Sequence, residues 1–427
     1  MGLLLRGGLV IDPAQALEAA RDILIEDGRL MALVAPGSVT EAGHRVIEAA
    51  DFVVCPGLID MHTHLREPGQ EYKETIATGG QAAAAGGFTA IACMPNTIPV
   101  NDSATVTRFI LEKAAQAKGP RVYPVAAISQ GSRGEVLAEY GELKAAGAVA
   151  LSDDGRPVSN SQLMRRALEY AHTFDLPIIS HSEDLALTGN GVMHEGIVSL
   201  QMGLRGIPAA AEETAIFRDV ALARLTGARL HIAHVSTAGS VEIIRQAKAA
   251  GTQVTAETAP HYFSLTDEAV RGFNTNAKMS PPLRTAADVA AIKKGLADGT
   301  LDCIATDHAP HSSLEKEVEF DQAANGIIGL ETALGLSLNL VWEGVLTLSQ
   351  MVAKLSANPA RILRVPGGTL QVGKPADITV IDLNHAWTVD VQQFKSKSRN
   401  CPFHGWQLTG KPVLTMVGGE IIYKLKE

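Results

Sequence analysis

The sequence predicts an α/β protein that consists of a (β/α)8 TIM barrel and a small β-sandwich-like domain formed from both termini. The first observation is an alternation of eight short apolar runs with longer, helix-like segments through the middle of the chain. The second is that both ends carry short β-like runs separated by glycine and aspartate turns. The third is the length of 427 residues, which suits a large barrel with an added β unit.

The apolar runs of the middle region are the predicted barrel strands. They are Phe52–Met61, Phe88–Met94, Val122–Ile128, Ala148–Leu151, Leu176–Ser180, Leu230–Ala233, Gln253–Ala256 and Leu301–Ala305. Segments between them, such as Ser161–Phe174 and Ala210–Thr226, have the composition and spacing of helices. A doubly wound open sheet is the alternative, but no GxGxxG motif follows any of these runs. We therefore expect a barrel over residues 54–365, with reactive side chains where each strand meets its loop.

The two ends of the chain predict short strands. The N-terminal runs are Leu9–Ile11, Ile23–Ile25 and Leu30–Val34, and the C-terminal runs are Ile378–Ile381, Val413–Val417 and Ile421–Tyr423. Each end alone is short for an independent domain. We expect residues 1–53 plus 366–427 to form one small β domain, with the barrel inserted between its two parts.

Composition and charge exclude several classes of protein. Apolar residues make up 46% of the chain and charged residues 19%, which excludes a disordered or fibrous protein. A net charge of −9 without a dense basic cluster argues against binding to nucleic acid or to an anionic membrane. No apolar run reaches the roughly 18 residues that cross a bilayer, and no export signal is visible, so we expect a cytoplasmic location. The four cysteines lie far apart, which predicts neither a disulfide framework nor a thiolate metal site.

Histidines and carboxylates gather where the predicted barrel strands end. His62 and His64 follow the first strand, and residues i and i+2 of a strand point to the same side. Other strand ends carry Asp153, Asp154, His181, His234, Asp307, His308 and His311. Imidazole and carboxylate without thiolate form a ligand set suited to Zn²⁺ or a similar divalent ion. A single HxH pattern is a weak signal, but its agreement with the other strand ends favours a metal centre.

Four histidines and two aspartates exceed the ligand number of a single catalytic zinc, which has about three protein ligands plus water. Six ligands suit two metal ions if one carboxylate bridges them. Two such ions about 3.5–4 Å apart can hold a shared hydroxide and polarise a carbonyl group. One carboxylate would then move the proton, and Asp307, at the last strand end, is the candidate for this catalytic role.

Three further histidines near the strands receive other interpretations. His231 alternates with Ala233 within the sixth strand and is expected to be a core residue. His308 follows Asp307 directly and is expected to face the opposite way. His261, after the seventh strand, lies near the rim but is not needed for the ligand count.

A set of motifs extends over nearly the whole chain. It consists of Asp60–Gln70 (DMHTHLREPGQ), Ala82–Thr89 (AAAAGGFT), Met94–Thr97 (MPNT), Ser152–Gly155 (SDDG), Lys278–Arg284 (KMSPPLR), Thr306–His311 (TDHAPH), Gly329–Thr332 (GLET), Asn358–Arg361 (NPAR) and Gly373–Asp377 (GKPAD). In these motifs the chain resembles dihydroorotases of the bacterial class I type, which belong to the amidohydrolase superfamily. HLREPG and DHAPH together make the resemblance specific, whereas AAAAGG alone would not.

The resemblance implies two zinc ions per subunit that are bridged by an aspartate and a hydroxide. The ligands would be His62, His64 and Asp307 for one ion, His181 and His234 for the other, and Asp154 as the bridge. The family spacing to the fifth-strand histidine favours Asp154 over Asp153. Hydantoinases and dihydropyrimidinases instead bridge their metals with a carboxylated lysine. The nearest upstream lysine here, Lys144, lies in a helix-like stretch, which argues against that branch.

The resemblance also implies a set of substrate contacts. These residues are His64, Arg66, Asn96, Ser280, His311, Asn325 and Gly326. Arg66 would pair with the substrate carboxylate in the two-point geometry of a guanidinium group, and Asn96 and His311 would complete the clamp. The chain departs from the family pattern at Ser280, where the family usually has Asn, and at Asn325, where it often has Phe. Neither position is an implied metal ligand, so activity is expected to survive with altered affinity.

The implied activity is the reversible, zinc-dependent interconversion of dihydroorotate and N-carbamoyl-L-aspartate in de novo pyrimidine (UMP) biosynthesis. Two alternatives stay open: another cyclic amidohydrolase such as allantoinase, and a non-catalytic dihydroorotase-like subunit that binds aspartate carbamoyltransferase. The retention of all six ligand candidates argues against the non-catalytic subunit. A homodimer and a complex with aspartate carbamoyltransferase also stay open. Pro310–Gly326 is the expected lid, because it is long, polar and attached to the last strand.

Overall fold

The computed structural model describes residues 2–40 and 42–426, and its centre is an eight-stranded parallel sheet. The strands are β6 (Leu58–Thr63), β7 (Phe88–Cys93), β8 (Arg121–Ala126), β9 (Ala150–Leu151), β10 (Ile178–Ser180), β13 (Leu230–Ile232), β14 (Val254–Thr258) and β15 (Cys303–Ile304). They stand in sequence order, so each strand pairs with the next one along the chain. A parallel bridge between Thr63 and His308 joins the two edges of the sheet. The predicted (β/α)8 barrel is therefore confirmed.

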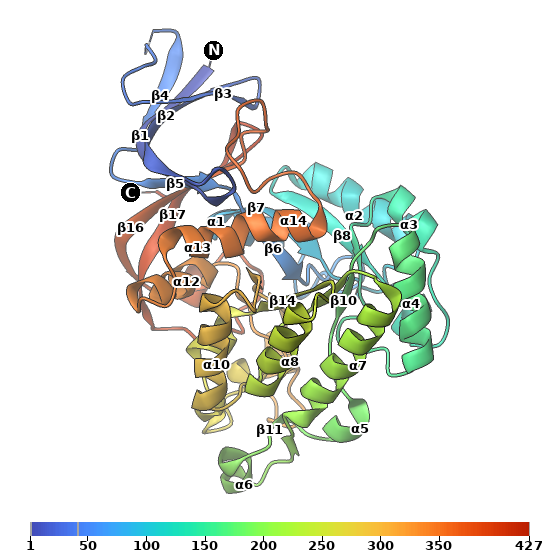
Figure 1. The fold of residues 1–427 in the computed structure, drawn as a ribbon. Coiled ribbons are helices and arrows are strands. Elements are labelled where there is room, and N and C mark those ends of the chain that lie inside the picture. The colour runs from blue at the N-terminus through green and yellow to red at the C-terminus, as the bar shows by residue number, and fades with distance from the viewer. Residues whose placement is uncertain (1, 41, 427) are drawn as a thin grey trace.

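Longer helices cover the outer face of this barrel. They are α1 (Ile76–Ala85), α2 (Ala104–Ala117), α3 (Tyr140–Ala146), α4 (Ser161–Thr173), α7 (Ala210–Thr226), α8 (Ala238–Ala249), α10 (Ala286–Ala297) and α12 (Ala333–Trp342). Figure 1 shows α7, α8 and α10 side by side along the barrel, and contacts between successive members of this row agree with the view. Polar N-cap residues fix where helices begin. Thr75 accepts from the Thr78 amide before α1, and Asn160 accepts from the Gln162 amide before α4.

Shorter elements lie within the connections between strands and helices. They are α5 (Leu185–Thr188), β11 (Met193–His194), α6 (Ile197–Met202), β12 (Gly206–Ile207), α9 (Pro260–Ser264), α11 (Ser313–Lys316), α13 (Leu348–Val352) and α14 (Asn358–Leu363). β11 and β12 pair with each other in a separate two-stranded sheet. Among the helices of the described residues, none has the length and apolar character needed to cross a bilayer.

The two ends of the chain form a second eight-stranded sheet. Its strands are β1 (Gly2–Asp12), β2 (Leu17–Glu26), β3 (Arg29–Val34), β4 (His44–Glu48), β5 (Val53–Pro56), β16 (Ile378–Thr388), β17 (Gln407–Val417) and β18 (Glu420–Lys424). β5 pairs in parallel with β1 and antiparallel with β16, so it joins the N-terminal strands to the C-terminal ones. Figure 1 shows the N-terminal strands in blue beside the C-terminal strands in red, and their apolar side chains form a core of their own. The predicted β unit from both termini is confirmed. Its unpredicted strand, β4, contains no fully buried residue and therefore lacks an apolar signal.

The single strand predicted over Phe52–Met61 is wrong, because the structure divides this segment between the two sheets. β5 belongs to the terminal sheet and β6 to the barrel, and Gly57 separates them. A Cβ atom at Gly57 would lie 2.0 Å from Thr89 Oγ1, so the close approach of β7 requires glycine here. We propose that the chain divides into a β unit of residues 1–53 plus 366–427, extended by β5, and a barrel unit that begins after Gly57.

The interior of the barrel is closed at one end. One buried apolar cluster fills it, with the residues Met61, Ala92, Met94, Val125, Ala150, Ile179, Ala233, Cys303, Ala305, Ile362 and Leu363. The last two belong to α14, which covers the N-terminal ends of the strands, because Arg229, just before β13, donates to the carbonyl of Ile362. α14 therefore closes this end of the barrel interior, and the carboxyl ends of the strands are where barrels of this kind place their ligand sites.

Candidate metal centre and substrate pocket

The side chains that follow the barrel strands line a pocket with a volume of about 370 Å³. Its lining contains the predicted site residues His64, Arg66, Asn96, Asp154, His181, His234, Ser280, Asp307, His311 and Asn325. The two other predicted residues lie behind the lining: His62 Nε2 is 3.4 Å from Asp154, and Gly326 packs closely against His311. The structure thus brings all predicted site residues together at the carboxyl ends of the strands.

Three ligand atoms meet at the junction of the first and last barrel strands. His64 Nε2 lies 3.0 Å from Asp307 Oδ1, and His62 Nε2 lies 3.4 Å from the same oxygen. His62 belongs to β6, His64 comes directly after the end of β6, and Asp307 follows β15. The φ of Asp307 is 48°, a left-handed conformation that is strained for a residue with a side chain and that recurs at functional positions.

Asp154 faces the ligand atoms of every strand end in the cluster. Its Oδ1 lies 3.4 Å from His62 Nε2, 3.4 Å from His181 Nδ1 and 3.5 Å from His234 Nε2. Its Oδ2 lies 3.4 Å from His64 Nε2. Oδ1 therefore faces the imidazoles of three strand ends, and Oδ2 faces His64.

The spacing of these atoms suits bound cations. Ligand atoms around a tetrahedral zinc, with Zn–N distances of about 2.0–2.1 Å, lie about 3.3 Å apart. The separations between the carboxylate oxygens and the ring nitrogens here are 3.0–3.5 Å. His181 Nδ1 and His234 Nε2 are 2.8 Å apart, a contact between ring nitrogens that requires a shared proton or a common cation. Within residues 2–40 and 42–426, His62 Nε2 and Asp154 Oδ1 are buried without a hydrogen-bond partner, and a metal ion would satisfy both.

Two sets of three convergent ligands follow from these distances: His62 with His64 and Asp307, and His62 with Asp154 and His234. Burial raises the pKa of Asp154, but the His62 charge and the close imidazoles of His181 and His234 outweigh it and hold the pKa well below its usual value. Burial raises the pKa of Asp307 as well, but His62 and His64 outweigh it and lower the pKa. Both carboxylates therefore stay ionised among the surrounding imidazoles, which is the charge that a cation site requires.

Hydrogen-bond acceptors opposite Nδ1 fix the orientation of His62 and His64. His62 Nδ1 lies 2.7 Å from Glu257 Oε1, and His64 Nδ1 lies 2.8 Å from Asn96 Oδ1. Each ring can donate its Nδ1 proton to this acceptor and present the lone pair of Nε2 to the pocket. Asn96 was predicted only as a substrate contact, and its carbonyl oxygen therefore has a second use.

Glu257 is a site residue that the sequence motifs do not indicate. It is 1% exposed, it belongs to β14, and its Oε2 lies 3.2 Å from His231 Nε2. His231 Nδ1 lies 2.8 Å from Thr255 Oγ1, so the expected core histidine continues a hydrogen-bonded chain through the barrel. Burial raises the pKa of Glu257, but His231 and His62 outweigh it and lower the pKa to about 2. The predicted seventh strand ends at Ala256, one residue short of this inward position, and a longer strand would have found it.

Asp153 and Lys144 lie outside the ligand cluster. Asp153 Oδ1 accepts from the amides of Ile128 at 2.8 Å and Ser129 at 3.1 Å, so this carboxylate holds the loop after β8. Lys144 belongs to α3, and its Nζ donates to the carbonyl of Phe174. The pocket lining contains no lysine.

Arg66 and His311 lie side by side in one corner of the pocket. Arg66 Nε donates to the carbonyl of Pro310 at 3.1 Å, and Arg66 Nη2 lies 3.3 Å from His311 Nε2. Burial, together with the nearby Arg66 cation, lowers the pKa of His311 to about 2, so the imidazole is neutral. A buried guanidinium beside a neutral imidazole offers several donors to a carboxylate.

The segment around Gly326 lies directly against this corner. A Cβ at Gly326 would lie 2.6 Å from the Ala309 carbonyl oxygen and 2.7 Å from His311 Cδ2, so only glycine fits. His311 Nε2 lies 2.8 Å from the carbonyl oxygen of Asn325. Ser280 and Asn325 line the pocket, and within the part of the chain that the structure describes neither side chain has a hydrogen-bond partner.

Two buried lysines hold the predicted lid, Pro310–Gly326, in place. Lys316, in α11, donates from Nζ to the carbonyls of Ala324 at 2.8 Å and Gly326 at 3.1 Å. Lys278 donates from Nζ to the carbonyls of Phe320 and Ala323, both at 2.7 Å. The segment is ordered against the pocket, and its movement stays a prediction.

His308 and His261 supply no ligand atom to the two convergent sets. His308 faces away from the pocket, with Nε2 3.5 Å from Glu74 Oε2 and Nδ1 accepting from the amide of Gly329 at 3.2 Å. His261 is 1% exposed, and burial lowers its pKa to about 4.

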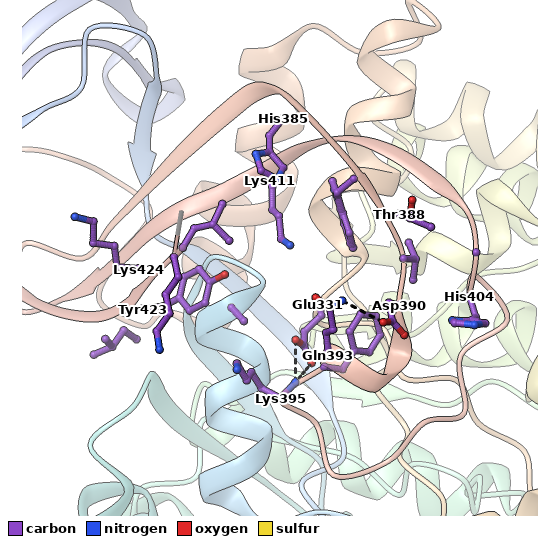
Figure 2. A pocket seen from close by; sticks show the side chains of 18 residues that line it. Glu331, His385, Thr388, Asp390, Gln393, Lys395, His404, Lys411, Tyr423 and Lys424 are labelled. Carbon is purple, nitrogen blue, oxygen red and sulfur yellow. Dashed lines mark hydrogen bonds between the residues drawn. The ribbon is translucent and has the colours of Figure 1, made fainter.

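A larger cleft of about 1120 Å³ lies beside β16, β17 and β18, away from the strand ends (Figure 2). Glu331 accepts there from the amides of Lys395 at 2.8 Å and Ser396 at 3.1 Å. Lys411 Nζ lies 4.5 Å from the centre of the Trp387 ring. The cleft contains none of the candidate metal ligands. Although this cleft is larger than the pocket at the strand ends, it is therefore not the candidate active site.

Comparisons with known proteins agree with the geometry of the pocket at the carboxyl ends of the barrel strands. Family models match the chain as Dihydro-orotase-like over residues 52–240 and as Amidohydrolase family over residues 198–423. A protein named dihydroorotase from Syntrophotalea carbinolica is 59% identical over 427 residues, covering 100% of both chains. Another of that name from Geobacter sulfurreducens is 60% identical over 423 residues, covering 99% of both chains.

Solved structures give the same architecture. An L-hydantoinase from Arthrobacter aurescens has a TM-score of 0.90 at 27% identity and covers 100% of this chain and 96% of its own. A dihydropyrimidinase from Brevibacillus agri has a TM-score of 0.85 at 24% identity, covering 99% of this chain and 95% of its own, and shows the shared fold. The sequence matches extend from one end of the chain to the other and include both the barrel and the terminal sheet. The chain therefore belongs to the dihydroorotase family of the amidohydrolases.

Proposed function

We propose that the chain catalyses the reversible hydrolysis of dihydroorotate to N-carbamoyl-L-aspartate, a step of pyrimidine biosynthesis. The observation that carries the proposal is the presence of five metal-ligand candidates and an arginine–histidine corner in the lining of one pocket of about 370 Å³, with the sixth candidate, His62, directly behind it. A cyclic amide that bears a carboxylate needs both parts. The full-length relatives named dihydroorotase support this substrate.

The proposed cofactor is a pair of zinc ions. His62, His64 and Asp307 would hold one ion and His181 and His234 the other, with Asp154 between them. Bound zinc would supply a Lewis acid for the amide carbonyl and lower the pKa of a water molecule. Glu257 would keep the imidazole of His62, and Asn96 that of His64, in the tautomer whose Nε2 lone pair faces the bound ions.

Asp307 is the proposed proton carrier. Its Oδ1 lies on the pocket wall, 3.0 Å from His64 Nε2. In the hydrolytic direction it would accept the proton of the attacking water and deliver it to the ring nitrogen as the C–N bond breaks. In the synthetic direction the same carboxylate would accept the proton of the attacking carbamoyl nitrogen and deliver it to the carboxyl oxygen that leaves as water when the C–O bond breaks.

Arg66, His311 and Asn96 are the proposed clamp for the substrate carboxylate. The guanidinium of Arg66 and the imidazole of His311 lie 3.3 Å apart, so one carboxylate can contact both. Ser280, Asn325 and the backbone of Gly326 would face the rest of the ring. In ring closure this clamp would keep the open chain folded, which reduces its entropic cost.

Two observations favour this substrate over those of related amidohydrolases. Arg66 is 8% exposed, and a substrate without a carboxylate would leave this buried cation without an anionic partner. The position between the histidines is occupied by Asp154, and Lys144 lies in α3. Allantoinase activity and a non-catalytic role are the alternatives. A non-catalytic role is disfavoured because every ligand candidate is present.

The test combines metal analysis with turnover on the purified chain. We expect about two zinc ions per chain and turnover of dihydroorotate in both directions, with allantoin and hydantoin at least about 10²-fold poorer by kcat/KM. Equal turnover of allantoin would refute the substrate assignment, and a metal-free chain with full activity would refute the cofactor. Homodimerisation and binding to aspartate carbamoyltransferase stay predictions, which light scattering on the chain alone and on the mixture would test.

A further inference from the structure

Asn400 comes from the terminal β unit but lies at the rim of the barrel. It belongs to the connection between β16 and β17 and is 3% exposed. Its Oδ1 accepts from the amide of His311 at 3.0 Å. Its Nδ2 donates to the carbonyls of Ala309 at 2.9 Å and Gly326 at 3.0 Å. Both ends of this one amide group are therefore engaged with backbone on two sides of the pocket.

These partners belong to the two arms of the loop that carries the arginine–histidine corner. One arm runs through Ala309 to His311, and the other runs through Asn325 and Gly326. The carbonyl oxygen of Asn400 also accepts from the amide of Ile328 at 3.0 Å, next to the second arm. Asn400 thus joins the arms at the point where His311 Nε2 lies 2.8 Å from the Asn325 carbonyl oxygen.

The segment that carries Asn400 is itself firmly held. Figure 2 shows Lys395 bonded to Glu331, which accepts from the Lys395 and Ser396 amides. Ser396 Oγ donates to Glu74 Oε2 at 2.5 Å, and Ser398 Oγ donates to the carbonyl of Lys73 at 2.8 Å. Residues 395–400 therefore form a fixed support that connects the terminal β unit to the substrate loop.

We propose that Asn400 is a positioning residue that sets affinity for the substrate carboxylate. It fixes the distance between His311, with its neighbour Arg66, and the Asn325–Gly326 backbone. It touches neither the substrate nor the metal ligands. The proposal rests on the proposed function, because it concerns the same carboxylate clamp.

The chemistry of the contacts requires an amide at this position. Asn400 acts as an acceptor towards one amide and as a donor towards two carbonyl oxygens, and an asparagine supplies both from one flat group. Aspartate has the same shape but no donor, so Asn400→Asp would place a carboxylate oxygen against two carbonyl oxygens. The two arms would separate while the volume of the side chain is preserved.

The experiment compares Asn400→Asp with the matched control Asn358→Asp. Asn358 lies at the opposite end of the barrel, where its Nδ2 donates to the carbonyl of Asp302 at 2.8 Å. We expect Asn400→Asp to raise KM for dihydroorotate about 10–100-fold, with kcat within about threefold and metal content unchanged. Inhibition by dihydrouracil, which lacks the ring carboxylate, should change less than about threefold. Asn358→Asp should leave all four quantities unchanged.

A second variant covers the case in which Asn400→Asp does not fold. Asn400→Ser keeps a small polar side chain and should raise KM by less than Asn400→Asp does, again without loss of metal. KM changes no larger than those of the control, or equal weakening of dihydroorotate and dihydrouracil, would overturn the positioning role. If the wild-type chain binds metal but does not turn over dihydroorotate, the proposed function is refuted, and with it the carboxylate clamp on which Asn400 would act.

Discussion

Two hollows of the molecule differ in what their polar atoms do. The cleft beside β16 and β17 is about 1120 Å³, three times the 370 Å³ of the rim pocket. In the cleft, Glu331 accepts from two backbone amides and Trp387 Nε1 donates to the Gly410 carbonyl at 3.2 Å. At the rim pocket, His62 Nε2 and Asp154 Oδ1 are buried with no hydrogen-bond partner among the described residues.

This difference shows that volume does not locate the chemistry. Buried polar atoms without partners destabilise a fold, so they are retained where a bound cation or substrate completes them. The polar groups of the cleft already stabilise loops, as Glu331 does for the segment at Lys395. The small pocket holds the convergent ligands. Substitutions in the two hollows should therefore have very different effects.

The largest effect is expected for Asp307→Asn. The amide keeps the size of the side chain but cannot carry the proton, so kcat should fall about 10²–10⁴-fold. Stopped assays in both directions, with metal content measured on the same sample, would check this. A variant that retains both metals and turns over within tenfold of the wild-type rate would show that another group moves the proton.

A smaller but selective effect is expected when the same change is made in each hollow. Asp154→Asn should lose at least one of two metal ions and about 10²-fold in kcat/KM, because the bridging charge is removed. Asp390→Asn, in the cleft, should retain both ions and full activity, since Asp390 only accepts from the Gln392 amide and a side-chain amide. Equal metal loss in both variants would remove the distinction between the hollows.

A third effect concerns metal affinity more than turnover. Glu257→Gln removes the charge that accepts from His62 Nδ1, and zinc affinity should fall about 10–100-fold. Competition with a chromogenic chelator measures this directly. The control is Asp12→Asn, another buried carboxylate with several donors but far from the rim, and it should leave zinc affinity unchanged. Unchanged affinity in Glu257→Gln would assign the carboxylate to packing alone.

The smallest effect is a pH dependence of stability. Burial, together with the nearby Lys278, lowers the pKa of Lys316 from 10.5 to about 7. Between these values the unfolded chain binds a proton that the folded chain does not, so the free energy of unfolding rises with pH in this window. The Tm of the wild type minus the Tm of Lys316→Met should therefore rise by about 2 °C or more from pH 6.5 to pH 9.5. Lys293→Met, at an exposed ion pair, should show no such growth.

Much of the site follows from local patterns at the strand ends. His62 and His64 converge because alternate residues of a strand share a face. His181, His234 and Asp307 join them because each follows a parallel strand whose carboxyl end lies at the same end of the barrel. The departures at Ser280 and Asn325 are also readable from the motifs, and the structure places both on the pocket wall. The alternation of apolar runs with helical segments similarly predicts the barrel.

Other features depend on register and cannot be read from apolar runs. Asp153 and Asp154 are adjacent, yet one holds a loop and the other faces the histidines. Glu257 is a charged residue that extends a strand beyond its apolar part. The division of Phe52–Met61 at Gly57 arises because β5 finds partners from both ends of the chain, which no local window contains.

The amino-acid sequence by itself determined which residues can reach the rim, because strand periodicity and loop position are local properties of the chain. The tertiary structure alone decided which candidate ligand atoms lie together and which residues support them. Glu257 reaches His62 across 195 positions of sequence, and Asn400 reaches His311 across 89. Contacts at such separations depend on barrel closure and on the docking of the terminal β unit. Both result from burial of apolar surface over the whole molecule and leave no short-range pattern in the sequence.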